Sequence, residues 1–256
     1  MISAVRERFH AKSAAVLLSL ESHLNRIMIG WLIAAGLACL ARILISPTLG
    51  APIGVATLSP YILVVVAPLV SMIVAVRWFA LGDRMPQPEL RLAQVGRWRQ
   101  VSLPEARRHP LYGTTGIMVS LLVGMLINIP VRTAEYLVTM PAITEGSPHW
   151  LFVLHTLMTL DVVALSSLYA IAFIAALRKV PLFPRLLVAI WMADISMQLV
   201  VAQVAAGADL PAAVTAPLEM LLNGNVNKVL ISVALWLPYL LLSSRVNVTF
   251  RHRIAA

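Results

Sequence analysis

The sequence predicts an all-α fold: a polytopic membrane helix bundle with six transmembrane helices and both termini cytoplasmic. The composition, the number of long apolar segments and the distribution of charge predict it. Hydrophobic residues make up 60% of the 256 positions, charged residues make up 12%, and the mean hydropathy is +0.86. A soluble domain is usually about 45–50% apolar and about 25% charged. This chain has too little polar surface for water, so lipid is its expected solvent.

Six segments are long and apolar enough to cross a hydrocarbon layer of roughly 30 Å, which takes about 20 helical residues. Lipid offers the backbone no hydrogen-bonding partner, so each segment is expected to be helical, and none alternates like a barrel strand. Prolines inside such spans are tolerated as kinks. The predicted spans are Ile27–Ile45, Leu58–Phe79, Thr114–Thr133, Trp150–Leu177, Phe183–Ala206 and Leu218–Ser243.

The basic residues orient the chain in the membrane. Four precede the first span, seven lie between the second and third, three lie between the fourth and fifth, and three follow the sixth. Thus 17 of the 20 lysines and arginines fall on one side of a six-span chain. The positive-inside rule makes that side cytoplasmic and places both termini there. An odd number of spans would destroy the pattern.

Two segments outside the spans also carry apolar residues. Residues 13–27 repeat apolar side chains at helical spacing and are predicted to form an interfacial helix that leads into the first span. The segment from Gly82 to Leu111 mixes apolar residues with arginines. It is either an ordinary basic cytoplasmic loop or a helix lying on anionic lipid. The N-terminus only weakly imitates a signal peptide, so we expect it to be retained.

Small residues repeat every four positions in two spans, which gives each helix a narrow face that ends in an arginine. Such faces let membrane helices pack closely, so the first and third spans are predicted to pack through them. The shared pattern also suggests that the first two spans are a diverged copy of the next two. The stripes are Gly30, Ala34, Ala38 and Arg42 in the first span, and Gly116, Ser120, Gly124, Asn128 and Arg132 in the third.

Three polar residues lie near the predicted centre of the bilayer. Asp161 and Asp194 each lie about 11 residues into their spans, which a rise of about 1.5 Å per residue places near the midplane; Gln198 follows one turn later. We predict that the two aspartates approach one another or share a basic or amide partner, with Arg132 or Arg42 favoured by depth. Either they hold the bundle together through hydrogen bonds, or they handle a proton or a solute.

Basic side chains lie closer to the outer end of their spans. Arg42, Arg132, His155 and Lys228 share this depth, and three of them are the only basic residues outside the cytoplasmic pattern. One interpretation is that the long side chains reach outward to lipid headgroups, with Arg132 paired to Glu135. The other is an outward-opening vestibule that receives an anion, such as a lipid headgroup.

The end of the last span is predicted to be a membrane anchor. Trp236 and Tyr239 fall at the depth of the aromatic belt, and Arg245 and Arg251 are expected to meet lipid phosphates. Enzyme motifs such as H-E-x-x-H, paired cysteines, G-x-S-x-G or a phosphate-binding glycine loop do not occur, so neither a metal nor a cofactor is predicted. The basic residues are too dispersed for nucleic acid. The expected partners are membrane lipids and a small solute or anionic lipid.

The C-terminal half also contains a specific pattern, formed by the Phe183–Pro184 pair and by Trp236, Pro238, Tyr239, Ser244, Arg245, Val246, Thr249 and Phe250. Residues 114–253 thereby resemble a bacterial inner-membrane family known as domain of unknown function 2569, whose members look like compact four-span proteins. The resemblance implies a bacterial inner-membrane location. It also implies a division into a two-span extension, residues 1–111, and a four-span bundle, residues 112–256. It implies no established activity.

Three functions remain open from the sequence. The preferred hypothesis is a membrane protein that binds or transports a small solute or lipid through a polar bundle interior. The second is a structural or assembly protein whose polar residues only join helices. The third is an intramembrane enzyme acting on lipid headgroups, which the missing motifs disfavour. A cavity in contact with the polar residues favours the first, and a fully paired interior favours the second.

Overall fold

The computed structural model describes residues 2–46, 54–89, 92, 95–144, 146–208 and 210–256, with side chains described from Glu7 onward. Helices dominate these residues, and a two-stranded antiparallel sheet joins β1 to β2. In chain order the elements are α1 (Ile2–Ser22), α2 (Leu24–Ile45), α3 (Val55–Trp78), the 3₁₀ turn η1 (Gly82–Arg84), β1 (Trp98–Gln100), α4 (Leu103–Arg108), α5 (Ile117–Thr139), α6 (His149–Leu177), α7 (Phe183–Ala206), α8 (Ala212–Leu242), α9 (Ser244–Arg251) and β2 (Arg253–Ala255).

Six of the described helices are long and apolar enough to cross a bilayer, and they are α2, α3, α5, α6, α7 and α8. The predicted six-span, all-α fold is therefore confirmed. Two of the predicted spans were too short. Helix α5 continues through Pro130 to Thr139, and α8 begins at Ala212 and contains Pro217. A proline near a helix start costs few hydrogen bonds, and membrane helices accommodate internal ones.

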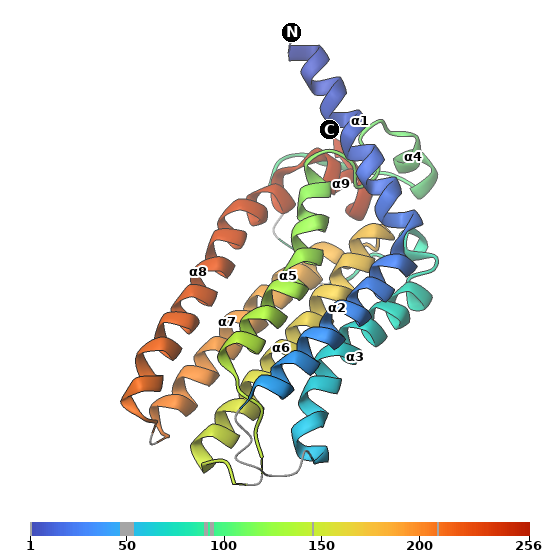
Figure 1. Ribbon diagram of the computed structural model, residues 1–256. Coiled ribbons are helices and arrows are strands. Elements are labelled where there is room, and N and C mark those ends of the chain that lie inside the picture. The colour runs from blue at the N-terminus through green and yellow to red at the C-terminus, as the bar shows by residue number, and fades with distance from the viewer. Residues whose placement is uncertain (1, 47–53, 90–91, 93–94, 145, 209) are drawn as a thin grey trace.

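Helix α6 occupies the centre of the bundle. It packs against α3, α5 and α7, while α2 covers α3 and α5, and α8 lies on α7 (Figure 1). Near its C-terminal end, Ala170 and every residue from Ala172 to Leu177 are buried. Buried residues from α2 and α3 belong to the same hydrophobic clusters as those from α5 to α8, so both predicted segments of the chain share one core.

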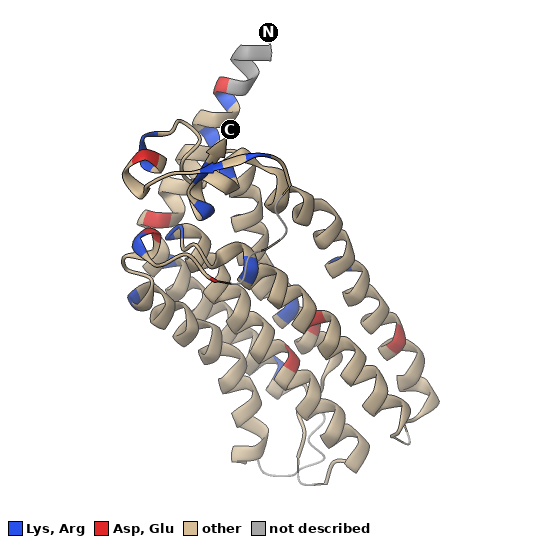
Figure 2. Ribbon diagram, turned by 180° about the vertical axis from the view of Figure 1, so that it is seen from behind, with Lys and Arg blue, Asp and Glu red and all other residues tan. Residues whose placement is uncertain are grey.

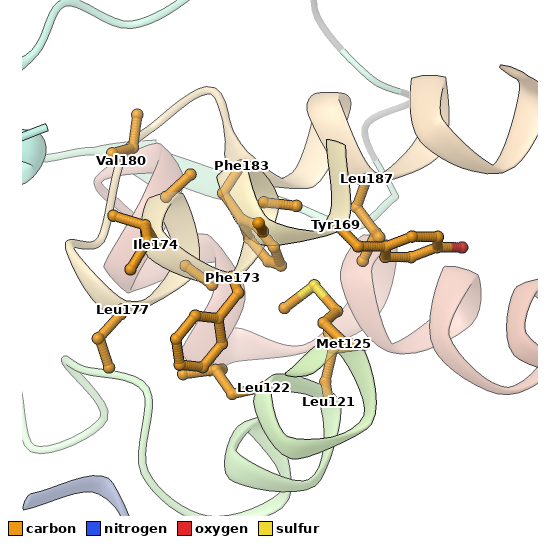
Figure 3. Close-up of a cluster of buried hydrophobic side chains, with 14 of the residues drawn as sticks. Leu121, Leu122, Met125, Tyr169, Phe173, Ile174, Leu177, Val180, Phe183 and Leu187 are labelled. Atoms are coloured by element: carbon orange, nitrogen blue, oxygen red, sulfur yellow. The ribbon is translucent and has the colours of Figure 1, made fainter. Parts of the chain in front are cut away.

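Both termini and the segment between α3 and α5 lie at one end of the bundle (Figure 1). Lysines and arginines gather there, whereas the helices beyond it carry few charged residues (Figure 2). We call this the basic end. Its apolar support is a cluster in which Phe173, Ile174 and Leu177 of α6 meet Leu122 of α5 and Phe183 of α7 (Figure 3).

The described residues between α3 and α5 form a cap at the basic end, made of η1, β1 and the short helix α4. Residues 90–91 and 93–94 of the possible lipid-facing helix lie outside the described residues, and residues 92 and 95–97 beside them are not helical. Strand β1 pairs with the C-terminal strand β2 in the register Arg99–Ile254. Of the two interpretations of this segment, the structure favours a loop, and it adds that the chain's C-terminus holds that loop in place. The predicted lead-in, residues 13–27, is helical but is divided between the end of α1 and the start of α2, and its interfacial position stays a prediction.

The prediction that the first and third spans pack through their small-residue stripes is wrong. Gly30, Ala34 and Ala38 are exposed, and α2 instead buries the adjacent face that carries Ala35 and Cys39. A Cβ atom added at Gly30 or at Gly124 of α5 would meet no atom within 4 Å. Helix α2 is rotated so that Leu24, Ala35, Cys39 and Ile43, which lie beside the stripe, are buried instead. The suggested duplication loses its main support.

Candidate functional site

The centre of the bundle contains an arginine shared by two aspartates. Arg132 of α5 donates from Nη1 to Oδ2 of Asp161 at 3.0 Å, and from Nη2 to Oδ2 of Asp194 at 2.6 Å. Asp161 lies on α6 and Asp194 on α7, and all three side chains are at least nine-tenths buried. The aspartates thus share one basic partner, as their matched depth predicted. Their role in handling a ligand or proton stays a prediction.

Two further side chains hold the aspartates. Gln198 Nε2 donates to Oδ1 of Asp161 at 2.9 Å and, more weakly, to Oδ1 of Asp194 at 3.5 Å. Tyr169 donates its hydroxyl to Oδ2 of Asp194 at 3.3 Å. The Tyr169 ring borders the apolar cluster, and its hydroxyl points away from that cluster (Figure 3). Tyr169 therefore lies at the boundary between the apolar and the polar parts of the interior.

The polar contacts continue onto α8. Asn225 of α8 donates to Oε1 of Gln198 at 3.2 Å. Lys228, one turn along α8, donates to Oδ1 of Asn225 at 3.4 Å and forms an ion pair with Glu135 of α5. Residues three or four apart share a helix face, which is why Arg132 and Glu135, or Asn225 and Lys228, face the same space. We call these residues, with Asp161, Asp194, Gln198 and Tyr169, the polar cluster.

A cavity of about 130 Å³ borders the polar cluster. It lies between α5 and α8, which pack mainly on α6 and α7 respectively. Figure 1 shows α7 in the space between them. We call this space the α5–α8 groove. Its polar lining consists of Asn128, Arg132, Glu135, Tyr169, Asp194, Asn225, Lys228 and Ser232, and Gly124, Trp191 and Trp236 are among its other lining residues.

The charges of the polar cluster do not cancel. Asp161, Asp194 and Glu135 are three acids, and Arg132 and Lys228 are two bases, so the fully ionised cluster has a net charge of −1. An isolated charge at the bilayer centre costs about 2.5–3.5 kcal/mol on insertion scales. A proton or a ligand with a cationic group would remove that cost. In addition, Arg132 Nε is buried and donates to no acceptor among the described residues.

The two other members of the predicted outer basic group lie elsewhere. Arg42 of α2 donates from Nε to the carbonyl oxygen of Met140 at 2.9 Å. His155 contacts the hydroxyl of Tyr136 at 3.1 Å and packs edge-on against the rings of Tyr136 and Tyr61. The anion vestibule containing all four is therefore wrong, and so is the Arg132–Glu135 pair. Depth alone could not reveal which way each helix faces.

The role of Trp236, Tyr239 and Arg245 as a membrane anchor stays a prediction. Trp236 and Tyr239 are half-buried neighbours whose ring centroids are 6.0 Å apart. Arg245 donates to Thr115 Oγ1 at 2.8 Å and remains partly accessible. Arg251, however, is buried and donates to the carbonyl oxygen of Leu240 at 3.0 Å, so it does not reach lipid phosphates.

Sequence reasoning identified Lys228 as a candidate but missed three residues of the site. Glu135 was considered only as a partner for Arg132, and nothing set Asn225 apart from the neighbouring asparagines of its span. Tyr169 gave no signal, because a tyrosine in an apolar span is usually core or interface. Charges of opposite sign at equal depth on α5 and α8 were the one available clue to the Glu135–Lys228 pair.

The fold and the groove define a multi-pass membrane protein with a buried, charged cluster beside a space between two spans. Comparisons with protein-family models, curated proteins and solved structures gave no match. The resemblance to the family of unknown function 2569 stays a prediction. Among the described residues, no group of three or more His, Cys, Asp or Glu side chains is arranged to hold a metal ion.

Proposed function

We propose that this protein binds a small polar solute or a lipid headgroup in the α5–α8 groove and moves it across the membrane. The observation that carries the proposal is the contact between the groove and the ion-paired centre: Arg132 and Asp194 both line the space. Buried ionisable groups in a membrane are costly unless they serve a partner, a path or a proton. We further propose a bacterial inner membrane, with the basic end in the cytoplasm.

Both signs of charge in the groove favour a ligand that itself carries both kinds of polar group. Arg132 and Lys228 can receive an anionic group, while Asp194 and Glu135 can receive a cationic one. Because each base is already paired with an acid, a ligand enters by exchanging partners within these pairs. Such exchange costs less than desolvating an unpaired charge, since no charge is left alone at any stage.

A structural role is the second candidate, and one observation favours it. The polar cluster joins α5, α6, α7 and α8 through side chains, so it also holds four spans together. A test must therefore alter the groove without touching the cluster. Gly124→Leu is suitable, because Gly124 lines the groove and a Cβ there meets nothing within 4 Å.

The test compares the molecules that remain bound to the purified protein, extracted and identified by mass spectrometry. Gly124→Leu is expected to retain at least tenfold less of the ligand than the wild type, with its thermal unfolding temperature unchanged. Ala134→Leu is the matched control on an exposed part of α5 outside the groove lining. Equal retention in both variants would reject the groove and leave the structural role.

A further inference from the structure

A second cavity lies on the same two helices as the α5–α8 groove, but closer to the basic end. Its volume is about 360 Å³. Ligand pockets typically have volumes of roughly 300–1,000 Å³. Its lining includes Phe9 and His10 of α1, Gly116 and Ile117 at the start of α5, Tyr239 of α8 and Arg245 of α9. We call it the basic-end cavity.

Arg245 is held in position at this cavity by the protein itself. Its Nη1 donates to Thr115 Oγ1 at 2.8 Å and to the carbonyl oxygens of Leu111 and Gly113 at 3.3 and 3.4 Å. A guanidinium fixed on one side can present its remaining N–H groups to an anion at little cost in conformational entropy.

Gly116 leaves the space between the two basic side chains open. A Cβ atom at this position would lie 3.6 Å from His10 Cε1 and 3.8 Å from Arg245 Nε, so both side chains border the volume that glycine does not fill. Gly116 also has φ +72°, a conformation that other residues rarely adopt. Arg245, a fixed cation, and His10, a ring that can donate a hydrogen bond, thus face one small space.

The cavity lies where a phospholipid could enter it from the bilayer. Phe9 and Ile117 of its lining are exposed apolar residues, which suits contact with acyl chains. Tyr239 lines this cavity, Trp236 lines the α5–α8 groove, and their rings pack edge-on. Aromatic residues of this kind are enriched at headgroup depth. The two spaces therefore follow one another along α5 and α8.

We propose that the basic-end cavity binds the phosphate of a phospholipid from the adjacent leaflet, through Arg245 and His10. The phosphate lies between the two side chains, and the acyl chains stay in the bilayer beside Phe9 and Ile117. Resting on the proposed function, the cavity is also the entry to the α5–α8 groove: a headgroup passes the Trp236–Tyr239 pair to reach the polar cluster. This assigns the transported ligand to the phospholipids.

The first experiment measures phosphatidylglycerol binding to the detergent-purified protein by native mass spectrometry, with phosphatidylcholine and inorganic phosphate as comparison probes. Arg245→Gln is expected to weaken phosphatidylglycerol binding about fivefold, the effect of one cation near an anionic surface. Adding His10→Ala should weaken it further. Arg108→Gln, an exposed change in the basic-end cap, is the control and should bind as the wild type does.

Each outcome decides a separate point. Unchanged phosphatidylglycerol binding in Arg245→Gln would overturn the site, provided that the variant unfolds at the wild-type temperature. Competition by inorganic phosphate at equal concentration would overturn the assignment to lipid and leave a free-anion site. If Gly124→Leu retains its ligand while Arg245→Gln still loses phosphatidylglycerol, the proposed function fails but the lipid site stands. If Gly124→Leu loses its ligand while Arg245→Gln binds phosphatidylglycerol as the wild type does, only the lipid site is rejected.

Discussion

At the scale of single residues, Arg132 is the counter-charge for the two buried aspartates at the centre of the bundle. Among the described residues it is the one cation paired with both Asp161 and Asp194, and the second cation of the cluster, Lys228, pairs with Glu135 instead. Removing Arg132 leaves two buried acids without a counter-charge, whereas removing one acid leaves a balanced pair. The two kinds of substitution should therefore differ sharply, although both delete one charge.

We predict that Arg132→Gln destabilises the protein by about 3–5 kcal/mol and Asp161→Asn by about 1–3 kcal/mol. Thermal unfolding in one detergent gives the comparison. The instability of Arg132→Gln should lessen as the pH falls, because protonation neutralises the acids that the variant leaves unpaired. Equal losses in the two variants, or no improvement at low pH, would show that the aspartates do not depend on a shared cation.

At the scale of elements, Asp83 of η1 joins the beginning of the basic-end cap to its end. Its Oδ2 accepts from Arg107 Nη2 at 2.6 Å and from the hydroxyl of Tyr112 at 2.9 Å. Burial by itself raises the pKa of Asp83, but the hydrogen bonds from Arg107 and Tyr112 outweigh it and bring the pKa below its ordinary value. Burial and the bond to Asp83 raise the pKa of Tyr112 to about 12.

The lowered pKa of Asp83 predicts that the basic-end cap is sensitive to acid. An acid whose pKa is lowered by folding stabilises the fold when the pH is above the acid's pKa in the unfolded protein, about 3.9. This stabilisation is lost as the pH falls through the acid's pKa in the folded protein. Asp83→Asn should therefore raise amide hydrogen exchange in α4 roughly tenfold at neutral pH, as for one lost charge-assisted bond, with little difference from wild type at pH about 2. A difference that persists at low pH would assign the effect to packing.

At the scale of the whole molecule, apolar length and charge placement predicted most of the fold. Six uninterrupted apolar runs can only be helices in lipid, and depth along α6 and α7 brought Asp161 and Asp194 together. The sequence did not reveal the rotation of each helix about its axis. That rotation exposes the stripe of Gly30 and turns Arg42 and His155 away from the groove.

The sequence also did not reveal how the C-terminal residues pack. The arginines after the last span predicted a surface anchor, but the chain turns back, and Thr249 accepts a hydrogen bond from the Gly113 amide at 2.9 Å. Burial lowers the pKa of Arg251 to about 10, with Arg253 and Arg185 adding to the effect. A basic run on the cytoplasmic side is normally solvated. The pairing of β1 with β2 and the buried contacts of α9 show that this one is enclosed.

In the proposed function, the ligand passes through the groove between α5 and α8. If ligand passage needs these helices to separate or shift, then holding them at a fixed distance should stop it. Val131 of α5 and Ser232 of α8 both line the groove and can carry the link. Cys39, the only native cysteine, is replaced by alanine first, so that reagents meet only the introduced thiols.

We predict that a short thiol–thiol linker, joining Val131→Cys to Ser232→Cys through reducible bonds, abolishes transfer of a headgroup-labelled phospholipid between the leaflets of vesicles containing the protein. Reduction of the linker should restore transfer. Each single cysteine treated with the same reagent is the control, because it adds bulk without joining the helices, and it should keep most of the wild-type rate. Undiminished transfer in the linked protein would place the path elsewhere in the bundle. Equal inhibition by the single cysteines would mean that bulk in the groove, rather than movement of α5 relative to α8, limits passage.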